Sequence, residues 1–253
     1  MLFDHTKIES NISRATKQFT NQDRFLYQWA EQQILDRLKD IKRSFNNTLI
    51  ISDFATELEN MESGDTPAQQ PPHDCIISLF NLHREEHPQN QLQEILQRLK
   101  PDGLFIGVLF GDGALKELKQ AMVNTEMSLT NGCHQRTIPL MTKQQAGALL
   151  QEAGFALPVI DSETINVGYR NINSLYKDLR AMGETNSLMD RDKTILPKHF
   201  FSNVEDEYKK NFFEDEKYLA TYEVIFCTGW SPHENQQQPL RPGSGQTSLK
   251  DVL

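Results

Sequence analysis

Hydrophobic and polar positions alternate with two different periods along this chain, and together they predict an α/β domain. Apolar runs and two-residue alternation are typical of strands, whereas apolar positions three or four residues apart are typical of helices. The first pattern predicts strands at 49–51, 75–80, 103–110, 156–167 and 218–230. The second predicts helices at 22–42, from 88 to 99, from about 114 to 127, from 142 to 154 and at 172–182. The segment 183–216 is polar and predicts a loop followed by a helix.

The stretch from Asp74 to Leu118 carries the strongest fold signal. A buried strand ends in polar residues, an amphipathic helix begins at Pro88, and Leu99-Lys-Pro-Asp-Gly103 reverses the chain into a second apolar strand. Proline is favoured in the first turn of a helix, where its missing N–H costs nothing. The order strand, helix, strand predicts a βαβ unit with parallel strands.

Composition excludes some classes of protein. The 253 residues include 35 acidic and 26 basic side chains, a net charge of −9 that argues against a free nucleic-acid binder. No apolar run has the length of a membrane span and the N-terminus lacks a leader pattern, so a cytoplasmic protein is expected. The odd set Cys75, Cys133 and Cys227 predicts reduced, inert thiols, the first and last of them buried in strands.

Several motifs give the chain a resemblance to a known family. They are Phe3-Asp4, the Leu99–Gly107 run, Phe110-Gly111, Leu149–Phe155, Met182-Gly-Glu-Thr-Asn186 and Gly229-Trp-Ser-Pro-His-Glu234. With them the chain resembles the class I, AdoMet-dependent methyltransferases. More narrowly, it resembles the branch that contains the mitochondrial complex I assembly factor with protein arginine hydroxylase activity. Leu-Lys-Pro-Asp-Gly is common to many methyltransferases, whereas the last two motifs are specific to that branch.

The chain departs from this family where the cofactor would bind. The family pattern has an acidic residue and a glycine-rich turn after the first strand, but here Asp53 is followed by no glycine before Gly64. The segment 58–73 is also too short for two further crossovers, each of which needs more than about 30 residues. The resemblance therefore implies a truncated Rossmann-like sheet of about five strands in the family order 1-4-5-7-6. The sheet is expected to be mostly parallel with an antiparallel last strand, and to have helices on both faces.

This truncation leaves Leu49-Ile50-Ile51 as a new edge of the sheet. An apolar edge is an aggregation hazard unless something covers it. The N-terminal helix, the loop at 59–72 or a second subunit are the candidates, so a dimer through this edge is one expectation. The chain is expected to divide into an N-terminal helical segment (1–46), the truncated α/β domain (47–230) and an extended tail (231–253).

Candidate cofactor-binding residues follow the first two strands. Asp53 matches the family's motif acid, and Ser78, Asn81 and His83 lie where open α/β sheets place ligands. A remnant cleft and a solvated polar strand end both remain open for these three. His83-Arg-Glu-Glu-His87 has a zinc-peptidase spacing, but Pro88 disfavours one helix through both histidines. No metal site is predicted.

Candidate substrate or partner residues follow the later strands. Gly111 and Asp112 begin a Gly-Asp-Gly segment that allows close approach of a ligand or forms only a turn. The resemblance implies that Glu184 and His233 shape the substrate or partner site, where an acidic pocket would suit an arginine side chain. Capping and loop hydrogen bonds are the alternative role for these residues.

Two functions follow from the resemblance. The first is a methyltransferase-like protein that recognises a complex I subunit, with S-adenosyl-L-methionine (AdoMet) binding weak or lost. The alternative is an active AdoMet-dependent methyltransferase or arginine hydroxylase that acts on such a subunit. A third interpretation, a malonyl-carrier-protein methyltransferase, shares the early Phe-Asp and the fold but has no support from the C-terminal motifs.

Overall fold

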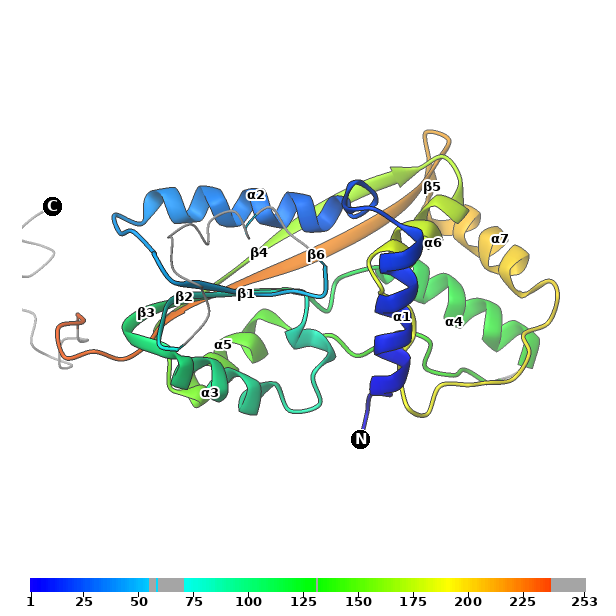
Figure 1. Cartoon of the computed structure of the whole chain (residues 1–253). Coiled ribbons are helices and arrows are strands. Elements are labelled where there is room, and N and C mark those ends of the chain that lie inside the picture. Colours follow the sequence, from blue (N-terminus) through cyan, green and yellow to red (C-terminus); the bar gives the residue numbers. More distant parts are fainter. Residues whose placement is uncertain (55–57, 59–70, 131, 238–253) are drawn as a thin grey trace, which may run out of the picture.

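The protein folds around one mixed β-sheet with helices on both faces (Figure 1). The structure is a computed structural model, and it describes residues 1–54, 58, 71–130 and 132–237. The strand order is β1-β2-β3-β6-β4, with the short β5 paired to β6. β1, β2 and β3 pair in parallel, and β6 is antiparallel to both β3 and β4. This order confirms the truncated sheet predicted from the sequence.

The strands agree with the apolar runs in the sequence. They are β1 (Thr48–Ile51), β2 (His73–Leu79), β3 (Leu99–Phe110), β4 (Ala156–Tyr169), β5 (Phe213–Glu214) and β6 (Lys217–Trp230). Their side chains alternate between two hydrophobic clusters because successive residues of a strand point to opposite faces. In β2, for example, Cys75 and Ile77 belong to one cluster and Ile76 to the other.

The helices divide between these two clusters. They are α1 (His5–Gln18), α2 (Phe25–Asp40), α3 (Pro88–Arg98), α4 (Lys116–Thr130), α5 (Lys143–Ala153), α6 (Ile172–Ala181) and α7 (Phe200–Phe212). α3 and α5 cover one face, whereas α2 lies along the other, and α1, α4, α6 and α7 gather at one end of the sheet (Figure 1). None of the helices within the described ranges is long and apolar enough to cross a membrane.

Local sequence signals set the ends of two helices as predicted. Pro88 occupies the first turn of α3. Thr142 caps α5 in a capping box with Gln145, and Gly154 ends the helix with a left-handed φ of 96°. A glycine tolerates that conformation because it has no Cβ atom.

Relative to the prediction, the structure adds the strand β5 and begins β3 four residues earlier. β5 forms a hairpin with β6 through Asp215 and Glu216, both of which have positive φ (47° and 59°). Such turns usually contain Asn-Gly or Asp-Gly, so the sequence carried no hairpin signal here. β3 begins at Leu99 rather than Gly103, because Leu99 already pairs with His73 before the register shifts.

The edge strand β1 is covered on both faces by side chains. Ile50 packs against the cluster that includes α2, and Leu49 and Ile51 pack in the cluster that includes α3. Most of the loop expected to cover this edge, residues 59–70, lies outside the described residues. Dimerisation through the edge and the three-part division of the chain stay predictions. Cys75 and Cys227 are buried as expected, whereas Cys133 is exposed.

Candidate functional site

A group of buried and half-buried charges lies at the carboxyl ends of β1 and β2. It contains Asp53, His83, Arg84 and Glu184, which we call the Arg84 network. Arg84 lies in a short 3-10 helix (Leu82–Arg84) after β2, and its Nη2 donates hydrogen bonds to Asp53 Oδ2 and, at 2.7 Å, to the Phe80 carbonyl. Its Nε lies 3.7 Å from Glu184 Oε1, and the same oxygen lies 3.1 Å from His83 Nε2. The network thus joins three segments that are far apart in the chain.

Burial makes the Arg84 network electrostatically strong. The side chain of His83 is fully buried, and those of Arg84 and Glu184 are 6% and 11% exposed. Burial alone would raise the pKa of Glu184, but the interactions with His83 and Arg84 outweigh it and hold that pKa below its usual value. Glu184 is therefore ionised at neutral pH and needs its internal partners.

Six buried polar atoms at or beside this strand end have no hydrogen-bond partner. They are Arg84 Nε and Nη1, Ser78 Oγ, Asn81 Oδ1, His83 Nδ1 and Tyr27 Oη. Burial raises the pKa of Tyr27 well above its usual range, so its hydroxyl stays protonated. Ser78 and His83 are buried and Asn81 is half-buried. The predicted residues Asp53 and His83 thus meet with Glu184, but in contact with Arg84, whose role the sequence did not reveal.

The Gly111-Asp112-Gly113 segment approaches another part of the chain closely. A Cβ atom on Gly111 would lie 2.5 Å from Glu223 Oε2, and the Gly113 N–H donates to the same oxygen at 2.8 Å. The glycines therefore make room for the Glu223 carboxylate of β6. The Asp112 side chain is exposed and lines a cavity.

His233 lies at the opposite end of the sheet from the Arg84 network. Its backbone N–H donates to Gln236 Oε1, and Gln236 in turn donates to Asp102 near the start of β3. His83, in contrast, packs against Phe110 at the end of that strand. The structure therefore does not bring His233 to Glu184.

A cavity of about 480 Å³ adjoins the Arg84 network beyond the end of β3. Its walls come from α4, the segment 136–140, α6, residues 184–186 and α7, and most of the lining is apolar. Asp112 and Glu184 are the two predicted site residues that line it. Pockets of this volume hold small-molecule ligands in many proteins.

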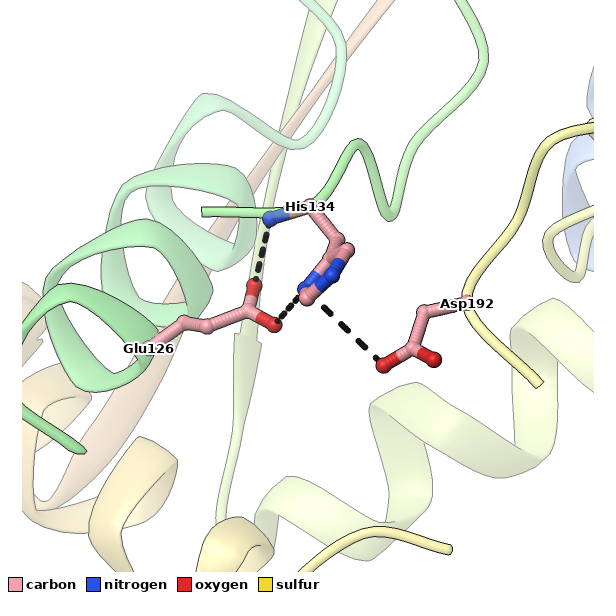
Figure 2. A group of neighbouring side chains, drawn as sticks. All are labelled: Glu126, His134 and Asp192. Carbon is pink, nitrogen blue, oxygen red and sulfur yellow. Dashed lines mark hydrogen bonds and ion pairs between the residues drawn. The ribbon is translucent and has the colours of Figure 1, made fainter. Parts of the chain in front are cut away.

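A second charged group lies beside this cavity (Figure 2). Glu126 Oε1 lies 2.7 Å from His134 Nδ1, and Asp192 Oδ2 lies 3.8 Å from the same nitrogen. These three side chains could supply metal ligands. Arg136, however, lies 2.6 Å from Glu126 Oε1 and 3.5 Å from Asp192 Oδ2. Because its guanidinium already forms ion pairs with both carboxylates, the group does not suit a divalent cation.

The chain is similar in sequence to two groups of enzymes. No family model matches it. It is 29% identical to "Arginine-hydroxylase NDUFAF5, mitochondrial" of Danio rerio, over 81% of this chain and 68% of that protein. It is 31% identical to the Homo sapiens protein of the same name, over 74% of this chain and 54% of that one. It is 28% identical to the malonyl-[acyl-carrier protein] O-methyltransferase of Laribacter hongkongensis, over 67% of this chain and 55% of that one.

The chain thus spans about half to two thirds of the length of these relatives. The sheet order and these likenesses agree with the resemblance seen in the sequence motifs. The chain has a class I methyltransferase-like fold and is similar in sequence to the relatives named arginine-hydroxylase NDUFAF5.

Proposed function

We propose that this protein recognises a protein partner during the assembly of respiratory complex I, and that its AdoMet binding is weak or lost. The observation that carries the proposal is the Arg84 network at the carboxyl ends of β1 and β2. In open α/β sheets this edge is where a nucleotide-like cofactor binds. Here the acid that a cofactor would need, Asp53, is already bound by Arg84.

Asp53 is the central residue in this argument. The resemblance implies that an acid after the first strand serves the cofactor, but Asp53 is hydrogen-bonded to Arg84. Releasing it would take the hydrogen-bonded carboxylate from a guanidinium that is 6% exposed, and would leave Glu184, at 3.7 Å, as its carboxylate partner among the described residues. No glycine follows Asp53 closely enough to let the backbone approach a ligand. These residues do not fit AdoMet.

The relatives support the proposed partner. Two of them carry the name arginine-hydroxylase NDUFAF5, and the resemblance links that branch to complex I assembly. The motif Met182–Asn186, which is specific to the branch, contributes Glu184 to the Arg84 network and three residues to the cavity wall. A protein that only binds its partner would retain these residues as an enzyme would.

The alternative function is an active AdoMet-dependent methyltransferase or arginine hydroxylase. The cavity of about 480 Å³ favours it, because it adjoins the end of β3 and could admit a side chain of a substrate protein. Glu184 already has His83 and Arg84 as partners, so it would have to exchange one of them to bind an arginine.

Calorimetric titration with AdoMet separates the two functions. The Laribacter hongkongensis methyltransferase relative, titrated in the same buffer, is the positive control. We expect no detectable heat of binding for this chain at protein concentrations that saturate the control. Binding with low-micromolar affinity would contradict the loss of the cofactor site and favour the enzyme.

The assembly role is tested in the organism that encodes the chain. Deleting its gene should lower the amount of assembled complex I, and the wild-type gene should restore it. Unchanged complex I would refute the role. The expected compartment, the cytoplasm, stays a prediction. Fractionation of cells that carry a tagged copy of the gene would test it.

A further inference from the structure

The cavity beside α4 and α6 has properties that the proposed function does not use, and the inference drawn from them does not rest on that function. Phe110, Leu118, Met122, Phe200 and Phe201 give it an apolar wall. An apolar wall of this extent favours a ligand with an aliphatic or aromatic body.

The charged residues at the cavity do not balance one another. Lys119 and Arg180 line it, are exposed, and form no ion pair among the residues that the structure describes. Asp112 is likewise unpaired within the described part of the chain, whereas Glu184 has internal partners. Two free cations thus stand against one free acid, in a chain whose net charge is −9. This local excess of positive charge favours an anionic group at the mouth of the cavity.

A polar group in the wall adds a hydrogen-bond donor. Tyr176 lines the cavity, and its hydroxyl is buried without a hydrogen-bond partner. Burial, with smaller contributions from Glu205 and Tyr218, raises the pKa of Tyr176 to about 12, so the hydroxyl remains a donor at neutral pH. Buried donors without partners are rare in folded proteins, and a ligand that supplies an acceptor would satisfy this one.

We propose that this cavity binds a small amphipathic carboxylate, with its hydrocarbon body against the aromatic wall and its carboxylate near Lys119 and Arg180. The two cations come from α4 and α6 and so reach the ligand from separate helices. The remaining cation at the wall, Arg136, is already ion-paired with Glu126 and Asp192 and takes no part.

The test uses 11-(dansylamino)undecanoic acid, a fluorescent long-chain carboxylate, with the full chain. We expect the acid to bind saturably and unlabelled dodecanoate to displace it. The methyl ester of the probe should bind with at least tenfold lower affinity than the acid. The double variant Lys119→Gln/Arg180→Gln should weaken binding of the acid about tenfold, because it removes two charge-assisted contacts. Both side chains are exposed, so the variant should keep the wild-type melting temperature.

The matched control is Lys116→Gln/Arg170→Gln, which removes the same net charge from exposed residues outside the cavity lining. It should bind the probe as the wild type does. Met122→Trp, which fills the cavity from α4, should abolish binding in the wild type and in the control variant alike. The proposal is overturned if the acid does not bind saturably, if the ester binds as tightly as the acid, or if the Lys119/Arg180 variant and its control weaken binding equally.

Discussion

Replacing Arg84 by methionine should destabilise the protein strongly, because Arg84 is the buried cation that two largely buried carboxylates share. The guanidinium donates to Asp53 and to the Phe80 carbonyl at 2.7 Å, and it lies 3.7 Å from Glu184. Arg84→Met removes all three interactions but keeps an unbranched apolar stem of similar length. Asp53 and Glu184, 19% and 11% exposed, then lose their cation.

Breaking a buried ion pair by removing one partner costs about 3–5 kcal/mol, mainly because the other charge remains buried. We therefore expect the free energy of unfolding of Arg84→Met to fall by about 3–5 kcal/mol at pH 8. Arg170→Met, at an exposed position, should change it by less than about 0.5 kcal/mol. Adding Asp53→Asn and Glu184→Gln to Arg84→Met removes the stranded charges and should recover part of the loss.

The loss should also depend on pH. In the wild type the pKa of Glu184 lies below its usual value, so its ionisation stabilises the fold above the unfolded-state pKa, and this contribution is lost as the pH falls through the folded-state pKa. Without Arg84, burial should raise that pKa, so the variant is penalised as the pH rises. Urea unfolding followed by circular dichroism should show a smaller difference between wild type and variant at pH 4.5 than at pH 8. A loss below 1 kcal/mol, or one that does not change with pH, would refute the role given to Arg84.

Three further predictions concern other parts of the fold. Gly111→Ala should lower the free energy of unfolding in urea by about 1–3 kcal/mol, because its Cβ would lie 2.5 Å from Glu223 Oε2. The control Gly147→Ala, inside α5 with its nearest neighbour at 3.4 Å, should be neutral or stabilising. Equal effects of the two substitutions would contradict this reasoning. Thr142→Ala should lower stability by about 1 kcal/mol through loss of the α5 capping box, whereas Thr142→Ser should retain it. Glu126→Gln should lower the free energy of unfolding by about 2 kcal/mol at neutral pH. Burial raises the pKa of Glu126, but Arg136 and His134 outweigh burial and lower it, so the loss should shrink as the pH falls through that lowered pKa. A loss that grows in acid would argue against the ion pair.

The sequence predicted the elements whose signals are local. Thr142 and Gly154 bound α5 because a hydroxyl cap and a left-handed glycine act within one helical turn. The strand order followed from the family resemblance, and the short segment between β1 and β2 indicated which two strands of that order the chain lacks. β5 was missed because its turn uses Asp215 and Glu216 rather than a glycine, so neighbouring strands rather than turn propensity hold it.

The candidate site was predicted only in part, because its contacts join distant segments. Asp53 and Glu184 were selected for their positions in family motifs and His83 for its place at a strand end, but nothing in the sequence indicated that Arg84 lies among them. Glu126, His134 and Asp192 were not selected at all, since they come from α4 and two polar loops with no shared pattern. The cavity likewise depends on how α4, α6 and α7 pack at one end of the sheet (Figure 1).

By itself, then, the sequence determined the βαβ unit and the ends of α5, because apolar periodicity, caps and loop lengths act over short distances. Its motifs carried the family resemblance, which in turn implied the truncated strand order. Only the tertiary structure decided what the polar residues do. His83 and Glu184 are 101 positions apart in the chain. They share a hydrogen bond because the segment after β2 and the loop after α6 lie next to each other at the same edge of the sheet. The charge of a buried residue depends on partners of this kind, and those partners are set by packing rather than by neighbours in the chain.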